Sequence, residues 1–269
     1  MKFTKMQGCG NDFIFIDCAK APPPEDIAGK TVRWCGRHFG VGADGVILLL
    51  PHETCDLRMR LVNADGSDAE MCGNAIRCVA KYLYERMGVK KDAYAVMTGR
   101  GKLTLLPKVE NGVVTAVTVN MGEPILDGPS IPVAASDPRA VEAEGFSFCC
   151  VSMGNPHAVT FVDDLAAVDF YRLGPLVERS AQFPNRVNVE FAQVLPDGIH
   201  VKVWERGAGE TLACGTGACA VLVAASLCGL AGREADVHLP GGTLHIKWDE
   251  DGAVYMTGPA EFVFDGEIG

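Results

Sequence analysis

Two short segments of the sequence share one pattern: residues 213–220 are ACGTGACA, and residues 71–78 are MCGNAIRC. In each segment a cysteine is followed by small or polar residues and then by an apolar, helix-forming run. A helix that begins beside a cysteine presents unpaired backbone N–H groups and the positive end of its dipole to the thiol. Both features bind anions and lower the pKa of a thiol from its reference value of about 8.5. We therefore predict chemistry performed by two thiols, Cys72 and Cys214.

The sequences that precede the two cysteines repeat each other. Three landmarks precede each cysteine in the same order. The asparagine of a Gly-Asn pair lies 61 or 59 residues before it, a residue beside a strand-like apolar run lies 27 or 26 residues before it, and a polar residue lies nine residues before it. In the first half these landmarks are Asn11, Gly45 and Asn63, and in the second half they are Asn155, Asn188 and Glu205. Three landmarks in one order, at nearly one spacing from the cysteine, indicate an internal duplication.

Length, composition and charge limit the kinds of protein that the sequence can encode. The 269 residues are 48% apolar and 22% charged, which is typical of a globular protein with a large core. The formal net charge of −10, without a cluster of Lys and Arg, argues against nucleic acid or an anionic membrane as a partner. We find neither a signal peptide nor an apolar run of the roughly 20 residues that a membrane span needs. We therefore expect a soluble, cytoplasmic protein.

The eleven cysteines are expected to be reduced thiols, because the sequence carries no export signal. Most are predicted to be small core residues: Cys18, Cys35, Cys55, Cys149, Cys150 and Cys228. A zinc site is the alternative for a second set: Cys72, Cys78, Cys214 and Cys219. Spacings of six and five residues on a helix direct these pairs to different faces, unlike the spacing of two to four residues in zinc sites. We therefore predict no metal site.

The apolar pattern predicts many strands and few helices, arranged alike in the two halves. Strands of the first half are expected at Phe13–Asp17, Gly45–Leu50, Leu57–Val62, Ala95–Thr98, Lys102–Lys108 and Val113–Asn120. Strands of the second half are expected at Ser147–Ser152, Ala158–Val162, Arg186–Gln193, His200–Trp204, Ala235–Leu239, Thr243–Trp248 and Ala253–Thr257. Helices are expected at Ile27–Phe39, Asn74–Met87, Asp169–Ser180 and Thr216–Leu230. Turn-forming residues between Gly122 and Pro138 mark the join.

A set of motifs spread over the whole chain resembles the diaminopimelate epimerase family. The set comprises GNDF at 10–13, NADGS at 63–67, CGN at 72–74, GNPH at 154–157, ERG at 205–207, ET at 210–211, ACGTG at 213–217 and MTGPA at 256–260. The combination is highly specific, although no single motif is.

The resemblance implies an α/β (α+β) fold of two pseudo-symmetric lobes, each a curved mixed sheet or barrel around a central helix. The lobes are expected at residues 1–121, carrying Cys72, and 122–269, carrying Cys214, with the active site in the cleft between them. The family interconverts LL- and meso-2,6-diaminopimelate, in lysine and peptidoglycan-precursor biosynthesis, without pyridoxal phosphate or metal. The resemblance therefore implies an isomerase with no cofactor, with diaminopimelate as its small-molecule substrate and a homodimer as its expected assembly.

The chemistry of inversion agrees with this implication. To invert an α-carbon, a proton must leave one face and another must arrive at the opposite face. A thiolate and a thiol, Cys72 and Cys214, can do this, with exchanged roles in the reverse direction. Backbone N–H groups at Gly73–Asn74 and Gly215–Thr216 would hold the α-carboxylate from two helix ends and stabilise the enediolate-like charge as it forms.

Further polar residues have both a functional and a structural interpretation. Glu205 would pair with the substrate α-ammonium and Arg206 would clamp the distal carboxylate, or both would belong to a surface ion pair at a strand end. Four asparagines would contact the distal amine and carboxylate, or act as turn and cap residues. These are Asn11, Asn63, Asn155 and Asn188. The resemblance places His157 and Glu205 where they help to poise the two thiols, whereas His157 alone is equally typical of a half-buried histidine with satisfied hydrogen bonds.

Two positions depart from the family pattern. Ala75 stands where the family usually has a glycine after Cys-Gly-Asn, which would alter the start of the helix. Gly45 stands where some members carry glutamine, so we expect no side-chain contact with substrate from this position.

Two other interpretations stay open. One is a cofactor-free epimerase or racemase of the same fold that acts on proline derivatives. Such proteins usually show histidine at the position of Asn74 and would not need Arg206 for a second carboxylate. The other is a thiol redox or metal-binding protein, which metal analysis and a thiol titration would reveal.

Overall fold

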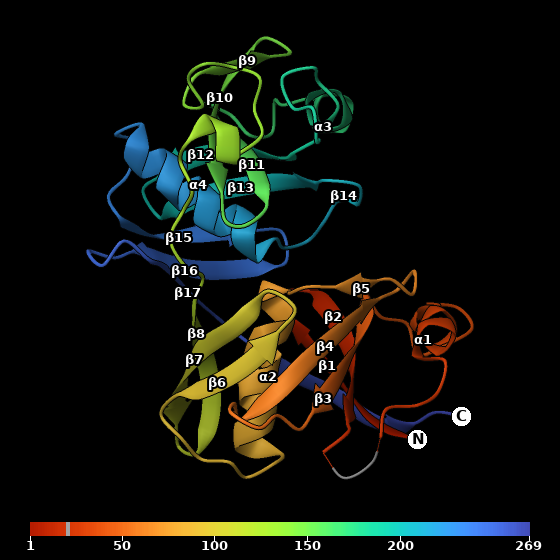
Figure 1. Ribbon diagram of the computed structural model, residues 1–269. Helices are drawn as coiled ribbons and strands as arrows, with labels where there is room; N and C mark the ends of the chain where they lie inside the picture. The colour runs from red at the N-terminus through yellow and green to blue at the C-terminus, as the bar shows by residue number, and fades with distance from the viewer. Residues whose placement is uncertain (20–21) are drawn as a thin grey trace. The chain divides into compact units, whose positions relative to one another are not determined.

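The computed structural model describes residues 1–19 and 22–269, which fold into two compact units (Figure 1). The first unit contains Met1–Val119 and Gly258–Gly269, and the second contains Asn120–Thr257. Each unit is a mixed α/β structure built around its own sheet and its own central helix.

The first unit is a curved mixed sheet around helix α2 (Gly73–Glu85). Its strands follow the order β18-β1-β2-β3-β4-β6-β7-β8, and the short β5 pairs with the end of β4. The pairs β2–β3 and β4–β6 are parallel. Helix α1 (Ile27–Cys35) packs beside β3 and β4. The strand bounds are β1 Lys2–Gly8, β2 Asn11–Asp17, β3 Gly45–Leu50, β4 Leu57–Asn63, β5 Asp68–Ala69, β6 Tyr94–Thr98, β7 Gly101–Glu110, β8 Val113–Asn120 and β18 Glu261–Glu267.

The second unit has the same plan around helix α4 (Gly215–Leu227). Its strands follow the order β9-β10-β11-β12-β13-β15-β16-β17, and the short β14 pairs with the end of β13. The pairs β11–β12 and β13–β15 are parallel. Helix α3 (Phe170–Glu178) packs beside β12 and β13, and a short 3₁₀ helix occupies Gly128–Ser130. The strand bounds are β9 Val141–Ala143, β10 Phe146–Ser152, β11 Pro156–Phe161, β12 Asn188–Leu195, β13 Gly198–Glu205, β14 Gly209–Glu210, β15 Glu234–Leu239, β16 Gly242–Trp248 and β17 Val254–Gly258.

These two plans match element by element, which confirms the predicted duplication. Strands β1 to β8 correspond in order to β10 to β17, α1 corresponds to α3, and α2 corresponds to α4. The sequence landmarks also take equivalent places. Asn11 begins β2 and Asn155 directly precedes β11; Gly45 and Asn188 begin β3 and β12; Asn63 and Glu205 end β4 and β13; Cys72 and Cys214 are the N-caps of α2 and α4.

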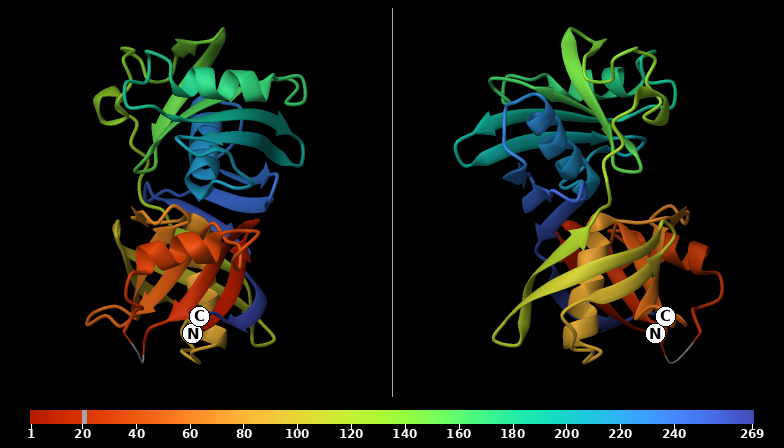
Figure 2. Two further views of the ribbon diagram at one scale, coloured as in Figure 1. Left: turned by 90° about the vertical axis from the view of Figure 1, so that its right-hand side faces the viewer. Right: turned by 60° about the vertical axis from the view of Figure 1, so that its left-hand side comes forward.

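Both central helices are enclosed by strands of their own unit, as the two views in Figure 2 show. Helix α4 is apolar on all sides, and residues 218–225 are all buried. Helix α2 also carries Arg77 and Lys81, whose buried cationic groups donate to backbone carbonyl oxygens. This enclosure fixes the N-terminal ends of the two helices, where the two cysteines lie.

The outer side of each sheet carries a second core beneath the shorter helix. In the first unit this core includes Trp34 of α1 with Val46 and Leu48 of β3. In the second unit it includes Phe170 of α3 with Phe191 of β12. Alternate residues of β3 and β12 therefore face this outer core, and the residues between them face the central helix.

The C-terminal strand changes the lobe boundaries expected from the sequence. Residues 258–269, expected in the C-terminal lobe, belong to the first unit, because β18 pairs antiparallel with β1 from Lys2–Glu267 to Gln7–Glu261. The thirteen predicted strands are present, but β1, β5, β9, β14 and β18 are additional. The four predicted helices are also present, and each ends earlier than expected. After α2 and α4, Gly88 and Gly229 adopt positive φ angles of 69° and 71°, which a helix cannot continue through.

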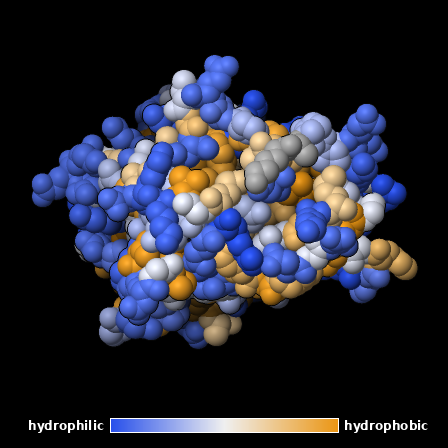
Figure 3. Space-filling view, turned by 90° about the horizontal axis from the view of Figure 1, so that it is seen from below, coloured by the Kyte–Doolittle hydropathy of each residue, from blue (hydrophilic) through white to orange (hydrophobic). Residues whose placement is uncertain are grey.

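Figure 3 shows one face of the protein, on which hydrophobic residues form small areas among hydrophilic ones. Exposed large apolar side chains such as Phe39, Tyr171 and Val263 come from different elements, as is usual on protein surfaces. In the described part of the chain, every helix is too short or too polar to span a bilayer.

Candidate active site

Cys72 and Asn11 are the centre of a polar group in the first unit. Cys72 is the N-cap of α2, in an extended conformation with φ −136° and ψ 121°, and is partly exposed. Its Sγ donates to Oδ1 of Asn11 at 3.3 Å, and Nδ2 of Asn74 donates to the same oxygen at 3.3 Å. The structure therefore brings together three predicted site residues from two separate motifs, GNDF at 10–13 and CGN at 72–74.

Asp44 fixes the orientation of Asn11 and was not predicted as a site residue. Nδ2 of Asn11 donates to Oδ2 of Asp44 at 2.5 Å, so Oδ1 must face Cys72. Arg37 holds the other oxygen of Asp44 at 2.8 Å. The available signal was the place of Asp44 in the chain, directly before the strand that begins at the landmark Gly45.

Other residues of this unit that the sequence singled out make local contacts in the present structure. Asn63 donates through Nδ2 to Oγ of Ser67 at 3.1 Å, as a turn residue does. The carbonyl oxygen of Gly73, the first residue of α2, accepts from Arg77 at 3.1 Å. A β-carbon at Gly45 would lie 2.7 Å from a carbonyl oxygen of β4, so no side chain fits at this position.

Cys214 is the centre of the equivalent group in the second unit. It is the N-cap of α4 and only 5% exposed. Its Sγ accepts from the N–H of Gly217 at 3.3 Å and lies 3.4 Å from Oγ1 of Thr216. Nδ2 of Asn155 donates to Oγ1 of Thr216 at 3.2 Å. Asn155 therefore bonds to the second residue of α4 as Asn11 bonds to the second residue of α2.

The electrostatic surroundings of Cys214 differ from the prediction. Burial, followed by the nearby carboxylates of Glu205 and Glu190, raises the pKa of the Cys214 thiol well above its ordinary value. Hydrogen bonds from Thr216 and from the N–H of Gly217 act in the opposite direction but are the smaller effects. The N–H of Gly217 at the helix end does lower the pKa of Cys214, but the net shift is upward, so the prediction of a lowered thiol pKa is wrong for Cys214.

Glu205, Arg206 and Asn188 lie together where β12 begins and β13 ends. Oε1 of Glu205 accepts from Oγ1 of Thr211 at 2.6 Å. Asn188 accepts from the N–H of Arg206 at 2.9 Å and donates to the carbonyl oxygen of Pro156 at 2.8 Å. Among the described residues neither Glu205 nor Arg206 has an ion-pair partner, so the alternative of a surface ion pair is not observed.

His157 forms a fully buried pair with Glu190, a residue that was not predicted. Nδ1 of His157 lies 2.6 Å from Oε1 of Glu190, and neither side chain has any exposed surface. The expectation of a half-buried, fully satisfied histidine is wrong, because Nε2 has no hydrogen-bond partner in the described chain. A glutamate between two apolar residues of β12, Val189 and Phe191, was the signal that could have identified Glu190.

All eleven cysteines are free in the structure. Cys18, Cys35, Cys149 and Cys150 are buried as predicted, whereas Cys55 is partly exposed and Cys228 is exposed because it caps the end of α4. Among the described residues, the group whose ligand atoms lie close enough to hold a metal ion is Asp197, His200 and His238, which includes none of the four cysteines considered for zinc.

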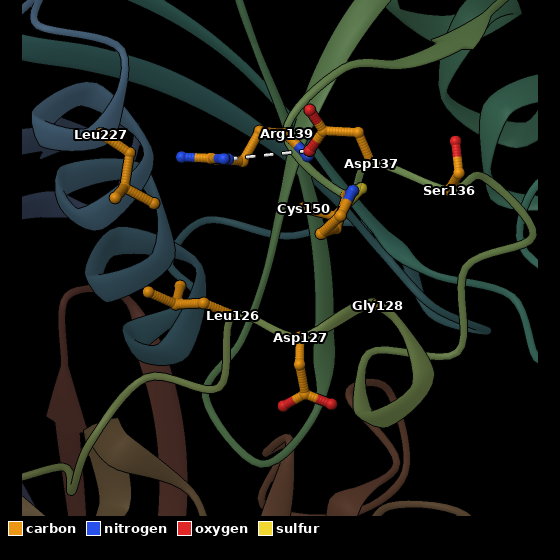
Figure 4. A pocket seen from close by; sticks show the side chains of 9 residues that line it. Leu126, Asp127, Gly128, Ser136, Asp137, Arg139, Cys150 and Leu227 are labelled. Atoms are coloured by element: carbon orange, nitrogen blue, oxygen red, sulfur yellow. Dashed lines mark hydrogen bonds and ion pairs between the residues drawn. The ribbon is translucent and has the colours of Figure 1, made fainter.

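A cavity of about 460 Å³ lies elsewhere in the second unit. Its lining includes Leu126, Asp127, Cys150 and Leu227, with Asp137 and Arg139 paired at its edge (Figure 4). No predicted site residue lines this cavity, so it does not belong to the site described above.

The two repeated units, each a sheet around a central helix, define a fold class that is shared with several solved structures. One is a phenazine biosynthesis protein of the PhzF family from Bacillus anthracis, with a TM-score of 0.73 and 15% identity over 100% of this chain and 98% of that one. Another is a probable proline racemase from Agrobacterium radiobacter K84, with a TM-score of 0.71 and 16% identity over 100% of this chain and 92% of that one. At these identities the likeness extends to the fold alone.

Sequence relatives place the chain more narrowly. The diaminopimelate epimerase family model matches residues 3–126 and 149–263. A diaminopimelate epimerase from Pelotomaculum thermopropionicum is 55% identical over 99% of this chain and 98% of the relative. One from Methanococcus maripaludis is 49% identical over 100% of this chain and 99% of the relative. The chain belongs to the diaminopimelate epimerase family and is an isomerase of the epimerase class.

Proposed function

We propose that this enzyme interconverts LL- and meso-2,6-diaminopimelate, and that Cys72 and Cys214 exchange the proton of one α-carbon. The observation that carries the mechanism is the equivalence of the two cysteines, each the N-cap of the central helix of its unit. The substrate assignment is supported by relatives of nearly the same length that are named diaminopimelate epimerase.

The two thiols must be in different protonation states for an inversion to proceed. One sulfur, as thiolate, takes the α-proton from its face, and the other, as thiol, delivers a proton to the opposite face. Cys214 suits the thiol role in the resting enzyme, because its raised pKa keeps it protonated at neutral pH. Cys72 is then the thiolate of the first turnover. Each turnover leaves the two charge states exchanged, which prepares the enzyme for the reverse direction.

The helix ends supply the stabilisation that a weakly acidic α-C–H requires. The backbone N–H groups of Gly73–Asn74 and Gly215–Thr216 lie in the first turns of α2 and α4, at the positive ends of the two helix dipoles. We propose that these groups hold the α-carboxylate and stabilise the negative charge that develops on it. This chemistry needs proton transfer and carboxylate binding only, so the proposal includes no cofactor and no metal.

Specificity for a substrate with two carboxylates is proposed to come from Arg206 and Glu205. Arg206 is exposed, and its side-chain hydrogen bond to the carbonyl oxygen of Asn185 is 3.4 Å long and therefore weak, so its planar guanidinium is available for a carboxylate. Glu205 is proposed to bind an ammonium group of the substrate. Oδ1 of Asn188 already accepts from the backbone N–H of Arg206, so we assign Asn188 the role of holding Arg206 in place. Asn63 and the amides of Asn11 and Asn155 are proposed to contact the remaining substrate groups.

The proposed setting of the reaction follows the family. We propose that the enzyme works in the cytoplasm, in lysine and peptidoglycan-precursor biosynthesis, and that it assembles as a homodimer. Sedimentation equilibrium of the purified protein would measure the assembly directly, and a mass equal to one chain would contradict the dimer.

Assay of the purified protein on LL-diaminopimelate, with chiral separation of the product, tests the function. We expect meso-diaminopimelate to form until the two isomers reach equilibrium, and we expect no racemisation of L-proline or hydroxyproline. Turnover of a proline derivative without turnover of diaminopimelate would favour the alternative function within the same fold.

A further inference from the structure

Two histidines and an aspartate form a group on the surface of the second unit. His200 on β13 and His238 on β15 are directly opposite each other in the parallel pair of these strands, and their ring centroids are 4.5 Å apart. Asp197 lies in the turn between β12 and β13 and contacts both histidines. One ligand atom from each of the three side chains lies within 4.8 Å of the other two. The folded sheet therefore brings nitrogen and oxygen ligands together from two separate segments of the chain.

The distances within this group suit ligands that share one small metal ion. Nε2 of His200 lies 3.1 Å from each carboxylate oxygen of Asp197, and Nε2 of His238 lies 3.0 Å from the backbone carbonyl oxygen of Asp197. Two ligands that are each about 2.1 Å from a zinc ion lie roughly 3.0–3.4 Å apart. The side chains of Asp197 and His200 are 64% and 34% exposed, so an ion can enter from solvent and a small rotation of these side chains completes the ligand set.

His238 is oriented in the way that metal-binding histidines are oriented. Its Nδ1 lies 2.9 Å from Oγ1 of Thr243 on β16, which leaves Nε2 on the side of Asp197. A histidine ligand almost always uses its other ring nitrogen in a hydrogen bond that fixes the ring. With a cation on Nε2, the ring proton is on Nδ1 and is donated to Thr243; without the cation, Nε2–H donates to the carbonyl oxygen of Asp197. Both forms of the ring are neutral, so the exchange requires no other reactant.

The turn that carries Asp197 can approach His238 closely because its next residue is glycine. Gly198 has a φ angle of 141°, and a β-carbon there would lie 2.8 Å from Nε2 of His238 and 2.5 Å from a carbonyl oxygen of β15. A side chain at this position would therefore displace the imidazole. In the first unit the equivalent residue is Asp56, whose carboxylate accepts from the N–H of Ala95 at 2.9 Å. The second unit thus leaves room for an imidazole nitrogen at this turn.

The first unit also shows that the sheet does not need histidines at these places. By the register of the parallel strand pairs, Arg58 and Met97 are the equivalents of His200 and His238. The exposed pair of His200 and Asp197 adds little to the stability of the fold by itself. Packing and ion pairing therefore do not account for two histidines beside an aspartate, whereas binding of a cation does.

We propose that Asp197, His200 and His238 bind a zinc ion at the surface of the second unit. Two imidazoles and a carboxylate suit Zn²⁺, whereas Ca²⁺ and Mg²⁺ prefer oxygen ligands alone. A zinc ion with three protein ligands takes water as its fourth ligand. The ion joins the β12–β13 turn to β15. It is separate from the proposed substrate contacts of β13, because Glu205 ends that strand five residues, or roughly 16 Å, beyond His200.

The zinc content of the purified protein tests the proposal. Parent and variants are dialysed against ZnCl₂ in the presence of a phosphine reductant, and bound zinc is measured by elemental mass spectrometry. Zinc held by thiols is common to all of them, so the difference in content reports on this site. We expect the parent to bind one zinc ion per chain more than His200→Gln or His238→Gln. Equal content in the parent and these two variants would overturn the proposal.

The matched control is His245→Gln in the same unit. The two ring nitrogens of His245 lie 2.8 Å from Asp236 and 3.0 Å from Glu234, so the carboxylates are on opposite sides of the ring and cannot share one ion with it. His245→Gln should therefore keep the parental zinc content. A loss of zinc in this control equal to that in His200→Gln would overturn the assignment of the ligands.

Two further variants separate a zinc site from a change in the fold. Thr243→Val keeps the three ligands but removes the oxygen that orients His238, and we expect it to weaken zinc binding by roughly 10- to 100-fold. The double variant of His200→Arg and His238→Met copies the pair of the first unit. We expect it to keep the parental circular dichroism spectrum and to lose the zinc ion. Parental zinc affinity in either variant would overturn the proposal.

Discussion

The thiol of Cys72 donates a hydrogen bond of 3.3 Å to Oδ1 of Asn11, which lies 61 residues earlier in the chain. The amide of Asn11 cannot turn freely, because its Nδ2 donates to Asp44 at 2.5 Å. Asp44 therefore fixes, through Asn11, the group that faces the sulfur of a cysteine that we propose to be catalytic.

The substitution Asp44→Asn should weaken this control. The new amide would be able to donate as well as accept, so the amide of Asn11 could turn and present Nδ2 to Cys72. We expect kcat/KM for diaminopimelate to fall by roughly tenfold, the equivalent of one hydrogen bond of about 1.4 kcal/mol. The control is Asp68→Asn, which removes an exposed pair with Arg60 and should keep the parental value. Equal kcat/KM for the two variants would show that Asp44 does not act on Cys72 through Asn11.

Cys214 should react slowly with alkylating reagents near neutral pH. Its pKa is raised, so the thiolate fraction is small at neutral pH and grows as the pH rises above the ordinary thiol range. Glu205→Gln should speed alkylation of Cys214 at a fixed pH near 8, because the Glu205 carboxylate is one cause of the raised pKa. Thr216→Val should slow it, because the hydrogen bond from Thr216 lowers the pKa. Rates that changed in the opposite directions would contradict this assignment of causes.

Mild oxidation should inactivate the substrate-free enzyme reversibly. Two thiols that serve one carbon from opposite faces can meet when no substrate separates them, and we expect peptide mapping to recover a Cys72–Cys214 disulfide. Dithiothreitol should restore turnover. Cys228→Ser, which removes an exposed thiol outside the proposed site, should be inactivated to the same extent as the parent. Full activity after oxidation, or a loss that maps only to other cysteines, would argue against a paired-thiol site.

Arg206→Lys should weaken the binding of a substrate with two carboxylates, because a planar fork is replaced by a point charge. We expect a loss of about 1.5–3 kcal/mol, equivalent to roughly a 10- to 150-fold rise in KM. Arg172→Lys, at an exposed pair with Asp169 on α3, is the matched control and should change little. Parental KM and kcat in Arg206→Lys would show that another group binds the distal carboxylate.

Much of the fold could be predicted because the duplication appears in the sequence as spaced landmarks. Each landmark falls at the beginning or end of the same element in both units, where a polar residue or glycine interrupts an apolar strand. Strands β1 and β18 were missed, and with them the true place of the C-terminal residues. The pattern of β18 is mostly exposed, so it lacks the alternation that identifies a half-buried strand.

Site residues that lie in a motif could be predicted from the sequence. Residues that only hold a motif residue in place could not. Asn11 comes from one motif and Cys72 and Asn74 from another, and Asn11 is hydrogen-bonded to both in the structure. Asp44 and Glu190 each contact a predicted site residue 33 positions away in sequence, and these partners are known only once the strands are paired. The raised pKa of Cys214 was also beyond the sequence, because it depends on how deeply the start of α4 is buried.

The isotope pattern of early turnover in D₂O tests the two-thiol mechanism most directly. Starting from LL-diaminopimelate, we predict deuterium at the inverted carbon of the meso product and almost none in the remaining substrate, because the delivered proton comes from a solvent-exchanged thiol on the other face. Cys72→Ala and Cys214→Ala should each lower epimerisation by roughly 10²–10⁴-fold or more. Early deuterium in the recovered substrate at the level of the product, or rapid epimerisation by either alanine variant, would contradict the account.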